Sequence, residues 1–250
     1  MTYDQMVRSL LNPVQDVDPT GFLIGVNWGG DVSASQTQPM QAAQNSAQVF
    51  LGANLKCASC HDSFVSDWKL RDTYGLASFF SEGPLEMVRC DVKTGEISPL
   101  KFLFPNLANG EAPKPLAERR DLVARLFTTP QNGRFARTIV NRVWKKLFGR
   151  GLVEPADDMV TEAWDNDLLD WLATDFVDHG YDLQWLLKRM MTSRTYQIPA
   201  VERSGEAHTY VFRGPLYRRL TAELFVDAVS SITGEWRIFD DKEGQGGTYI

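Results

Sequence analysis

Residues 57–61 have the pattern C-x-x-C-H, with thiols at Cys57 and Cys60 and an imidazole at His61. Two cysteines at this spacing lie on one turn of a helix, where both thiols can reach the two vinyl groups of one porphyrin. The histidine that follows then lies under the ring, where its imidazole can bind the iron. The pattern therefore predicts a covalently attached haem c, held by Cys57 and Cys60, with His61 as an axial iron ligand.

The same cysteine pair has three alternative interpretations: a zinc half-site, a thiol–disulfide motif, and a structural pair without a cofactor. Zinc needs four ligands, and the remaining candidates, Cys90, His179 and His208, are scattered along the chain. A thioredoxin-like motif would lie in an alternating strand–helix pattern, which the helix-rich surroundings do not offer. We interpret Cys90 as a small buried hydrophobic residue. Haem attachment is the leading hypothesis.

The sixth iron ligand is not determined by the sequence. Met40 or Met87 would give a Met/His pair, which raises the reduction potential, and His179 or His208 would give a bis-His pair. Each of these residues also has an ordinary structural interpretation, and an open sixth position is equally compatible with the pattern. The sequence therefore assigns His61 as one iron ligand and leaves the sixth ligand unassigned.

The composition is that of a globular protein, because 43% of the 250 residues are hydrophobic and 23% are charged. The formal charge of −6 argues against a nucleic-acid-binding surface that depends on bulk electrostatics. No apolar run approaches the length of a membrane span, so we expect no transmembrane segment.

The first six residues lack the basic region and apolar core of a signal peptide. Since this motif receives haem after export in bacteria, we expect an internal piece of a longer protein that works in the periplasm or elsewhere outside the cytoplasm.

Apolar residues recur at three- and four-residue spacing through most of the chain, which is typical of amphipathic helices. A helix from residue 39 is expected to run toward the cysteine pair, and residues 87–92 and 97–104 read as a β-hairpin with its turn at 93–96. Prolines and glycines between residues 105 and 115 mark a linker. The other predicted helices cover residues 2–11, 68–80, 116–128, 134–148, 165–178, 182–193 and 216–233.

The expected fold class is mainly α with a small β-hairpin. A helical haem-motif region at residues 1–110 is followed by a helical second domain at residues 111–250, which we expect to be truncated at its C-terminus. No internal repeat or long low-complexity tract interrupts this order.

Several short motifs stand out in both halves. In the first half they are residues 50–52, 57–62, 68–69, 72–77 and 79–80, and in the second half residues 135–137, 140–144, 148–153, 155, 157–158 and 193–197. With these motifs the chain resembles cytochrome-c-linked proteins that are abundant in planctomycetes, in which two domains of unknown function occur in tandem. The resemblance covers nearly the whole chain, and it implies an exported protein that works beside other cytochromes or redox proteins.

The chain departs from that family at two places. The family usually has a second histidine after the His-Asp pair, where this chain has Ser63. It also usually has a Ser-His-Pro-Glu stretch before a helix of the second domain, where this chain reads Trp-Asp-Asn-Asp at residues 164–167. If either histidine is a ligand or catalyst in the family, this chain lacks that group.

The densest polar grouping lies in the second half. Glycoside hydrolysis needs paired carboxylates, but Asp157 and Asp158 are consecutive, so their side chains diverge on a regular backbone. We therefore interpret the grouping as a salt-bridge network between helix ends, and catalytic residues stay unassigned. Its members are Arg137, Asn141, Arg142, Glu154, Asp157 and Asp158.

Three functions remain open at this point. The first is electron transfer through one covalent haem. The second is a role in an extracytoplasmic polysaccharide-degrading system, which only the context of the resembling family suggests. The third is a non-catalytic secreted protein whose cysteine pair is structural or binds a metal.

Overall fold

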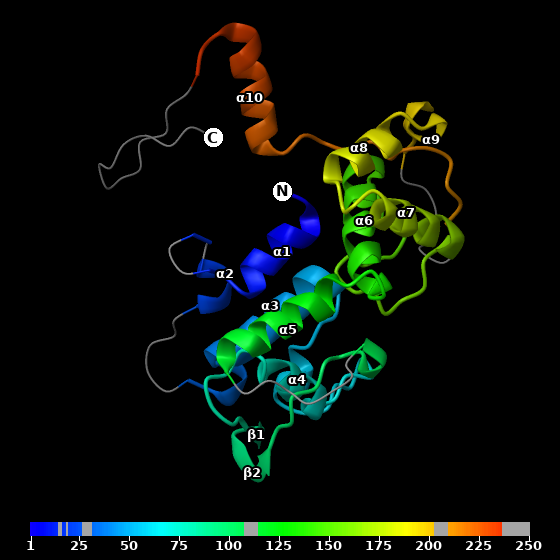
Figure 1. Cartoon of the computed structure of the whole chain (residues 1–250). Helices are drawn as coiled ribbons and strands as arrows, with labels where there is room; N and C mark the ends of the chain where they lie inside the picture. Colours follow the sequence, from blue (N-terminus) through cyan, green and yellow to red (C-terminus); the bar gives the residue numbers. More distant parts are fainter. Residues whose placement is uncertain (15–16, 19, 27–31, 108–114, 203–209, 237–250) are drawn as a thin grey trace.

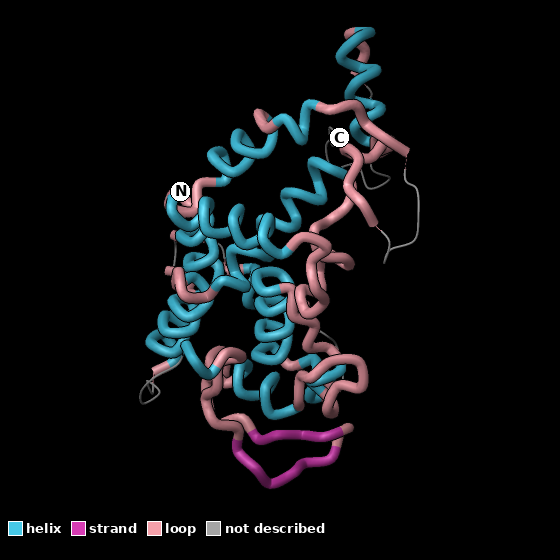
Figure 2. Tube along the Cα trace, turned by 90° about the vertical axis from the view of Figure 1, so that its right-hand side faces the viewer, coloured by secondary structure: helices cyan, strands magenta, loops and turns pink. Residues whose placement is uncertain are grey.

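The computed structural model describes residues 1–14, 17–18, 20–26, 32–107, 115–202 and 210–236. Within these residues the fold is mainly α with one small antiparallel hairpin, as predicted (Figures 1 and 2). The helices are α1 (Tyr3–Leu11), α2 (Gly21–Ile24), α3 (Gln38–Leu51), α4 (Leu70–Ala77), α5 (Leu116–Thr128), α6 (Gly133–Phe148), α7 (Asn166–Asp178), α8 (Leu183–Met191), α9 (Arg194–Gln197) and α10 (Ala222–Thr233). Three short 3₁₀ turns are η1 (Ala34–Gln36), η2 (Cys57–Ser59) and η3 (Pro105–Leu107), and the strands are β1 (Glu86–Arg89) and β2 (Val92–Ile97).

Most helix positions agree with the apolar spacing. The range of α5 is the predicted one, and α7 and α8 begin after Asp165 and Asp182, whose carboxylates accept backbone N–H groups of the first turn. Such N-caps satisfy donors that the helix itself leaves unpaired. Local capping therefore sets where α7 and α8 begin.

Three predicted helices differ most from the structure, and each is shorter than predicted. α3 ends at Leu51 because Gly52 is left-handed, with φ of 55°, and a Cβ there would lie 2.4 Å from Cγ of Met159. α4 covers Leu70–Ala77 rather than residues 68–80. α10 begins at Ala222 because the Thr221 side chain caps it, while Leu216 pairs with Val201 in an isolated parallel bridge. The cysteine pair therefore lies beyond α3 rather than near its end.

The hairpin is present, but its predicted turn was wrong. Arg89 pairs with Val92, so the turn lies at Cys90 and Asp91 instead of residues 93–96. Both turn residues have positive φ, 46° and 67°, as in the turns whose twist matches that of paired strands. Gly95, which suggested the turn, lies in β2, where the pairing register shifts opposite Met87. Residues 98–104 leave the hairpin, and Phe102 enters the core.

One hydrophobic core includes residues from both sides of the predicted boundary at residue 110. α1 packs against α5, and α3 packs against α4 and α6. Phe127 of α5 lies between Phe50 of α3 and Phe102, with ring centroids 6.3 and 5.4 Å away. The division into two domains at residue 110 stays a prediction, but residues from both parts pack into the same core.

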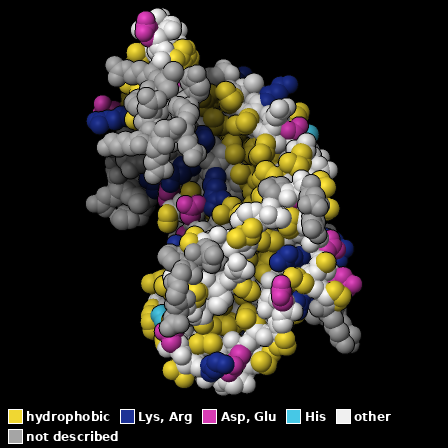
Figure 3. Space-filling model, turned by 90° about the vertical axis from the view of Figure 1, so that its left-hand side faces the viewer, with side chains coloured by type: hydrophobic (Ala, Val, Ile, Leu, Met, Phe, Trp, Pro, Cys, Tyr) yellow, Lys and Arg dark blue, Asp and Glu magenta, His cyan; other side chains and the backbone are white. Residues whose placement is uncertain are grey.

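The outer surface is mixed in character. On the face shown in Figure 3, hydrophobic side chains form a broad band along the body, with charged side chains beside it. α10 projects from the body in Figures 1 and 2, and its residues Leu224, Phe225 and Ile232 are exposed. In the described parts of the chain, no helix has the length and apolar character needed to cross a membrane.

Two buried phenols predict how stability depends on alkaline pH. Tyr3 and Tyr181 pack their rings on Phe135, and burial raises the pKa of both to about 12 from the ordinary 10.0. Since the folded state then holds these protons more tightly, their contribution is complete below about pH 10 and is lost as pH rises toward 12. We expect the melting temperature to fall over this window, and to fall less in a Tyr3→Phe, Tyr181→Phe double variant. If the melting temperature falls equally steeply in both proteins between about pH 9 and about pH 12, the raised pKa values of Tyr3 and Tyr181 are contradicted.

Candidate functional site

The C-x-x-C-H segment forms a single 3₁₀ turn, η2, rather than part of a longer helix. The N–H groups of Cys60 and His61 both donate to the carbonyl of Cys57, each at 3.2 Å. Ser59 closes the turn from its other side, because its hydroxyl donates to the carbonyl of Lys56. Cys57 is exposed and Cys60 is partly exposed, so both thiols can be reached from solvent.

His61 is held in one tautomer by its neighbour. Its Nδ1 lies 2.7 Å from the carbonyl oxygen of Asp62, and since a carbonyl only accepts, Nδ1 carries the proton. The lone pair of the neutral ring is therefore on Nε2, which is the arrangement common among metal-binding histidines. The ring of Phe64 packs against the imidazole at 4.7 Å between centroids.

The segment after the motif is tied to two other elements. One carboxylate oxygen of Asp62 accepts the N–H of Leu70 at the start of α4, and the other lies 3.5 Å from Arg89 in β1. Ser63, where the resembling family usually has histidine, accepts hydrogen bonds from Val65 and Ser66 and so stabilises a local turn. In this chain the position therefore serves a turn.

Cys90 was wrongly interpreted as buried. It is exposed in the hairpin turn, and its N–H donates to the carbonyl of Cys60 at 3.0 Å. Burial, and then a side-chain hydrogen bond with Cys90, raise the pKa of the Cys60 thiol. Sequence reasoning missed this contact because nothing local relates residues 30 positions apart.

The residues of the turn fit the attachment of a haem. Two accessible thiols and an imidazole with a free Nε2 lone pair are the donor set that this group requires. Phe64 and Val65, beside His61, are 89% and 88% exposed, and such adjacent apolar side chains are the kind that a porphyrin face covers. Among the described residues, no three His, Cys, Asp or Glu side chains converge as a metal ion would need, so the zinc interpretation gains no support.

The candidates for a sixth ligand lie in different surroundings. Met40 is fully buried in α3, and Met87 is buried in β1. His179 follows α7, where its ring stacks on Trp185 at 3.9 Å and its Nδ1 bonds to the carbonyl of Asp175. Figure 1 shows α7 well away from α4, which packs on η2. His208 lies outside the described residues, and the structure selects none of these candidates.

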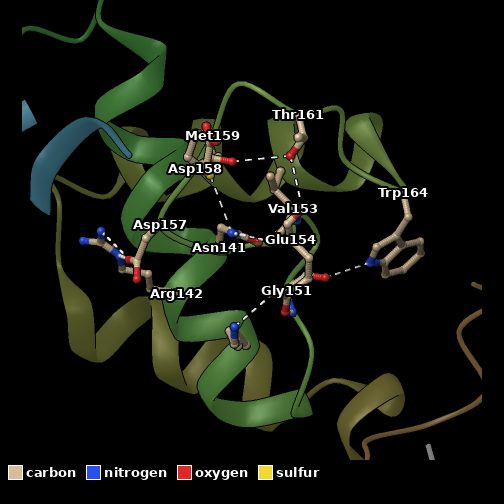
Figure 4. A network of polar contacts seen from close by, with 11 residues as sticks. Asn141, Arg142, Gly151, Val153, Glu154, Asp157, Asp158, Met159, Thr161 and Trp164 are labelled. Atoms are coloured by element: carbon tan, nitrogen blue, oxygen red, sulfur yellow. Dashed lines mark hydrogen bonds and ion pairs between the residues drawn. The ribbon is translucent and has the colours of Figure 1, made fainter. Parts of the chain in front are cut away.

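The polar grouping of the second half is a network of structural contacts (Figure 4). Arg142 pairs with Asp157 at 2.8 Å, and Lys145 pairs with Glu154 at 3.0 Å. A carboxylate oxygen of Asp158 accepts the N–H of Val160. This arrangement agrees with the salt-bridge interpretation, because each carboxylate already has a partner within the fold.

The same network joins the two halves of the chain. Arg142 donates to the carbonyls of Gln48 and Val49 at the end of α3, beside its contact with Asp157. Arg137 pairs with Asp170 at 2.7 Å and so connects α6 with α7. Cationic groups at a helix C-terminus interact favourably with its unpaired carbonyls.

The Trp-Asp-Asn-Asp stretch at residues 164–167 also has a structural role. Asp165 caps α7 by accepting the N–H of Leu168 at 2.9 Å. Trp164 donates from Nε1 to the carbonyl of Gly151 at 3.2 Å and stacks on Phe212. The residues that replace the family's usual histidine therefore stabilise the start of a helix.

Two family models match the chain. Residues 118–246, just over half of it, match PSD1, a protein of unknown function (DUF1553). Residues 1–84, which include the C-x-x-C-H turn, match PSCyt2, a protein of unknown function (DUF1549). Both are planctomycete-type families. No curated protein and no solved structure matches the chain.

Proposed function

The chain belongs to the PSD1 family of proteins of unknown function (DUF1553), and we propose that it is an exported c-type haem-binding protein that takes part in electron transfer. The observation that carries this proposal is the turn at residues 57–61. There, two accessible thiols flank one 3₁₀ turn, and His61 has its Nδ1 bonded to a backbone carbonyl. These are the three groups that attachment and axial ligation need.

Each residue of the turn has one task in this proposal. Cys57 and Cys60 supply the sulfur atoms for two thioether bonds to the porphyrin. Asp62, through its carbonyl, keeps the proton on Nδ1 of His61, which leaves Nε2 to bind iron. Phe64 limits rotation of the imidazole by packing against it.

The surroundings of the turn favour electron exchange over substrate turnover. When bound, a haem of this type supplies reversible one-electron transfer at its iron. Cys57, Phe64 and Val65 are all exposed, so the attachment side of the turn is accessible to another protein. We therefore propose other cytochromes or redox proteins as partners, in the periplasm or another extracytoplasmic compartment.

The test is expression of the chain with a c-type maturation system, followed by a pyridine haemochrome spectrum and mass spectrometry of a tryptic digest. We expect an α-band and a mass increase of one haem on the tryptic peptide 57–69. A Cys57→Ser, Cys60→Ser double variant should lose all covalent haem, because no thioether can form. His61→Ala should retain attachment but change the Soret spectrum, because the axial ligand is lost.

The matched control makes the same cysteine-to-serine substitution outside the motif. Cys90→Ser removes the third cysteine and leaves residues 57–61 intact, so it should carry at least as much haem as the unchanged protein. The proposal fails if no α-band and no adduct are found, or if an adduct survives in the double variant.

A further inference from the structure

The backbone brings two cysteines from distant parts of the chain together. The N–H of Cys90 donates to the carbonyl of Cys60 at 3.0 Å, and Sγ of Cys90 lies 3.8 Å from the same oxygen. Standard bond lengths then limit the separation of the two Cα atoms to about 7 Å. A disulfide commonly spans up to about 7 Å between Cα atoms, so the two residues are within reach of one another.

The side chain of Cys90 points toward Cys60. Its Sγ donates to the backbone carbonyl of Cys60, which lies 3.8 Å away. Cys90 is exposed and Cys60 is partly exposed, so a small oxidant can reach both.

The position of Cys90 is held by contacts that do not involve sulfur. Arg89 pairs with Asp62, two residues after Cys60, at 3.5 Å. The hydroxyl of Tyr74 accepts the N–H of Val88 at 3.1 Å and donates to its carbonyl at 3.3 Å. β1 is therefore fixed to the segment after η2 and to α4, and Cys90 stays beside Cys60.

Turn geometry gives no local reason for a cysteine at position 90. Its φ of 46° lies in the left-handed region, and the next residue has φ of 67°. Asparagine, aspartate and glycine are the residues that favour this pair of positions in hairpin turns. A residue found at a backbone position that disfavours it points to a role for its side chain.

We propose that Cys60 and Cys90 form a disulfide in the presence of a low-molecular-weight disulfide, and that this bond competes with haem attachment at Cys60. One thiol attacks the oxidant, forms a mixed disulfide and releases one small thiol. The other thiol attacks the mixed disulfide and releases the second small thiol. The two cysteines lose two electrons and two protons in total, and the oxidant is reduced to two thiols. The competition rests on the proposed haem attachment, but the disulfide itself does not.

The disulfide can be tested by peptide mapping of the full chain, made without haem maturation. The folded protein is incubated with oxidised glutathione, its free thiols are alkylated, and it is digested with trypsin. Cleavage at lysine and arginine leaves Cys57 and Cys60 in peptide 57–69 and Cys90 in peptide 90–93. We expect a reductant-sensitive link between these peptides in the unchanged protein and in Cys57→Ser, and its loss in the matched variant Cys60→Ser.

Each other outcome of the map overturns the pairing. A disulfide closed within peptide 57–69, with Cys90 alkylated, would mean that Cys57 is the partner of Cys60. A link that survives in Cys60→Ser would mean that Cys57 pairs with Cys90. No link at all would mean that the two thiols do not react with one another in the folded chain.

The competition is tested separately by haem loading. When the chain is expressed with the maturation system, Cys90→Ser should carry a larger haem fraction than the unchanged protein, because Cys60 stays free. Equal loading of the two proteins overturns the competition. Absence of haem from both contradicts the proposed function instead, and the peptide map still decides whether the disulfide forms.

Discussion

Phe127→Ala is expected to lower the free energy of unfolding by about 4 kcal/mol, because it removes a buried aromatic ring and leaves a cavity. Phe127 has no exposed surface, and its ring meets Phe50 and Phe102 edge to face. Such aromatic pairs stabilise a core beyond the area that they bury. For a chain of 250 residues this loss corresponds to about 10 °C in melting temperature.

The measurement is thermal and urea denaturation, followed by tryptophan fluorescence and far-ultraviolet circular dichroism. Phe64→Ala is the matched control, because Phe64 is 89% exposed and should change stability by less than about 0.5 kcal/mol. A loss below about 1 kcal/mol for Phe127→Ala would contradict the packing described here.

The same experiment bears on the predicted domain boundary. Phe50 and Phe102 come from the first half and Phe127 comes from the second half, yet they share one core. We expect both probes to report one coincident transition, and Phe127→Ala to shift it as a whole. Two separate transitions, of which only one shifts, would show that the halves unfold independently.

Asn141→Ala is expected to cost about 3 kcal/mol, because it leaves two backbone groups without a partner in the core. The fully buried Asn141 side chain donates to the carbonyl of Val153 at 3.0 Å and accepts the N–H of the same residue at 2.9 Å (Figure 4). Alanine can replace neither bond. In this variant, the segment from Val153 to Glu154 and Asp157 should also become less ordered.

Thr138→Val is the matched control for Asn141→Ala. Thr138 is also fully buried in α6, but its hydroxyl donates to the carbonyl of Arg134 within the same helix, so less than about 1 kcal/mol should be lost. Urea denaturation of both variants measures the difference. If Asn141→Ala remains within about 0.5 kcal/mol of the unchanged protein, water or a rearranged backbone satisfies Val153 and the prediction is wrong.

Much of the secondary structure can be predicted from the sequence because its causes are local. The apolar spacing of residues 116–128 predicts the range of α5. Asp165 and Asp182 predict where α7 and α8 begin, because aspartate is a favoured N-cap residue. The hairpin turn was misplaced because the local sequence around Gly95 is typical of a turn. Strand register, set by the contacts of β1 with α4 and by the Cys90–Asp91 turn, overrides that signal.

The candidate site divides in the same way. The order Cys57, Cys60, His61 is local, so the sequence by itself determined that two thiols and an imidazole lie on one turn and which chemistry they suit. The hydrogen bond that sets the tautomer of His61 is also local, because it joins His61 to the carbonyl of the next residue, Asp62. The approach of Cys90 to Cys60 was decided only by the tertiary structure. Cys90 reaches Cys60 because the ion pair of Arg89 with Asp62 and the bonds of Tyr74 to Val88 hold β1 in place. Contacts between residues this far apart depend on packing, which no local pattern encodes.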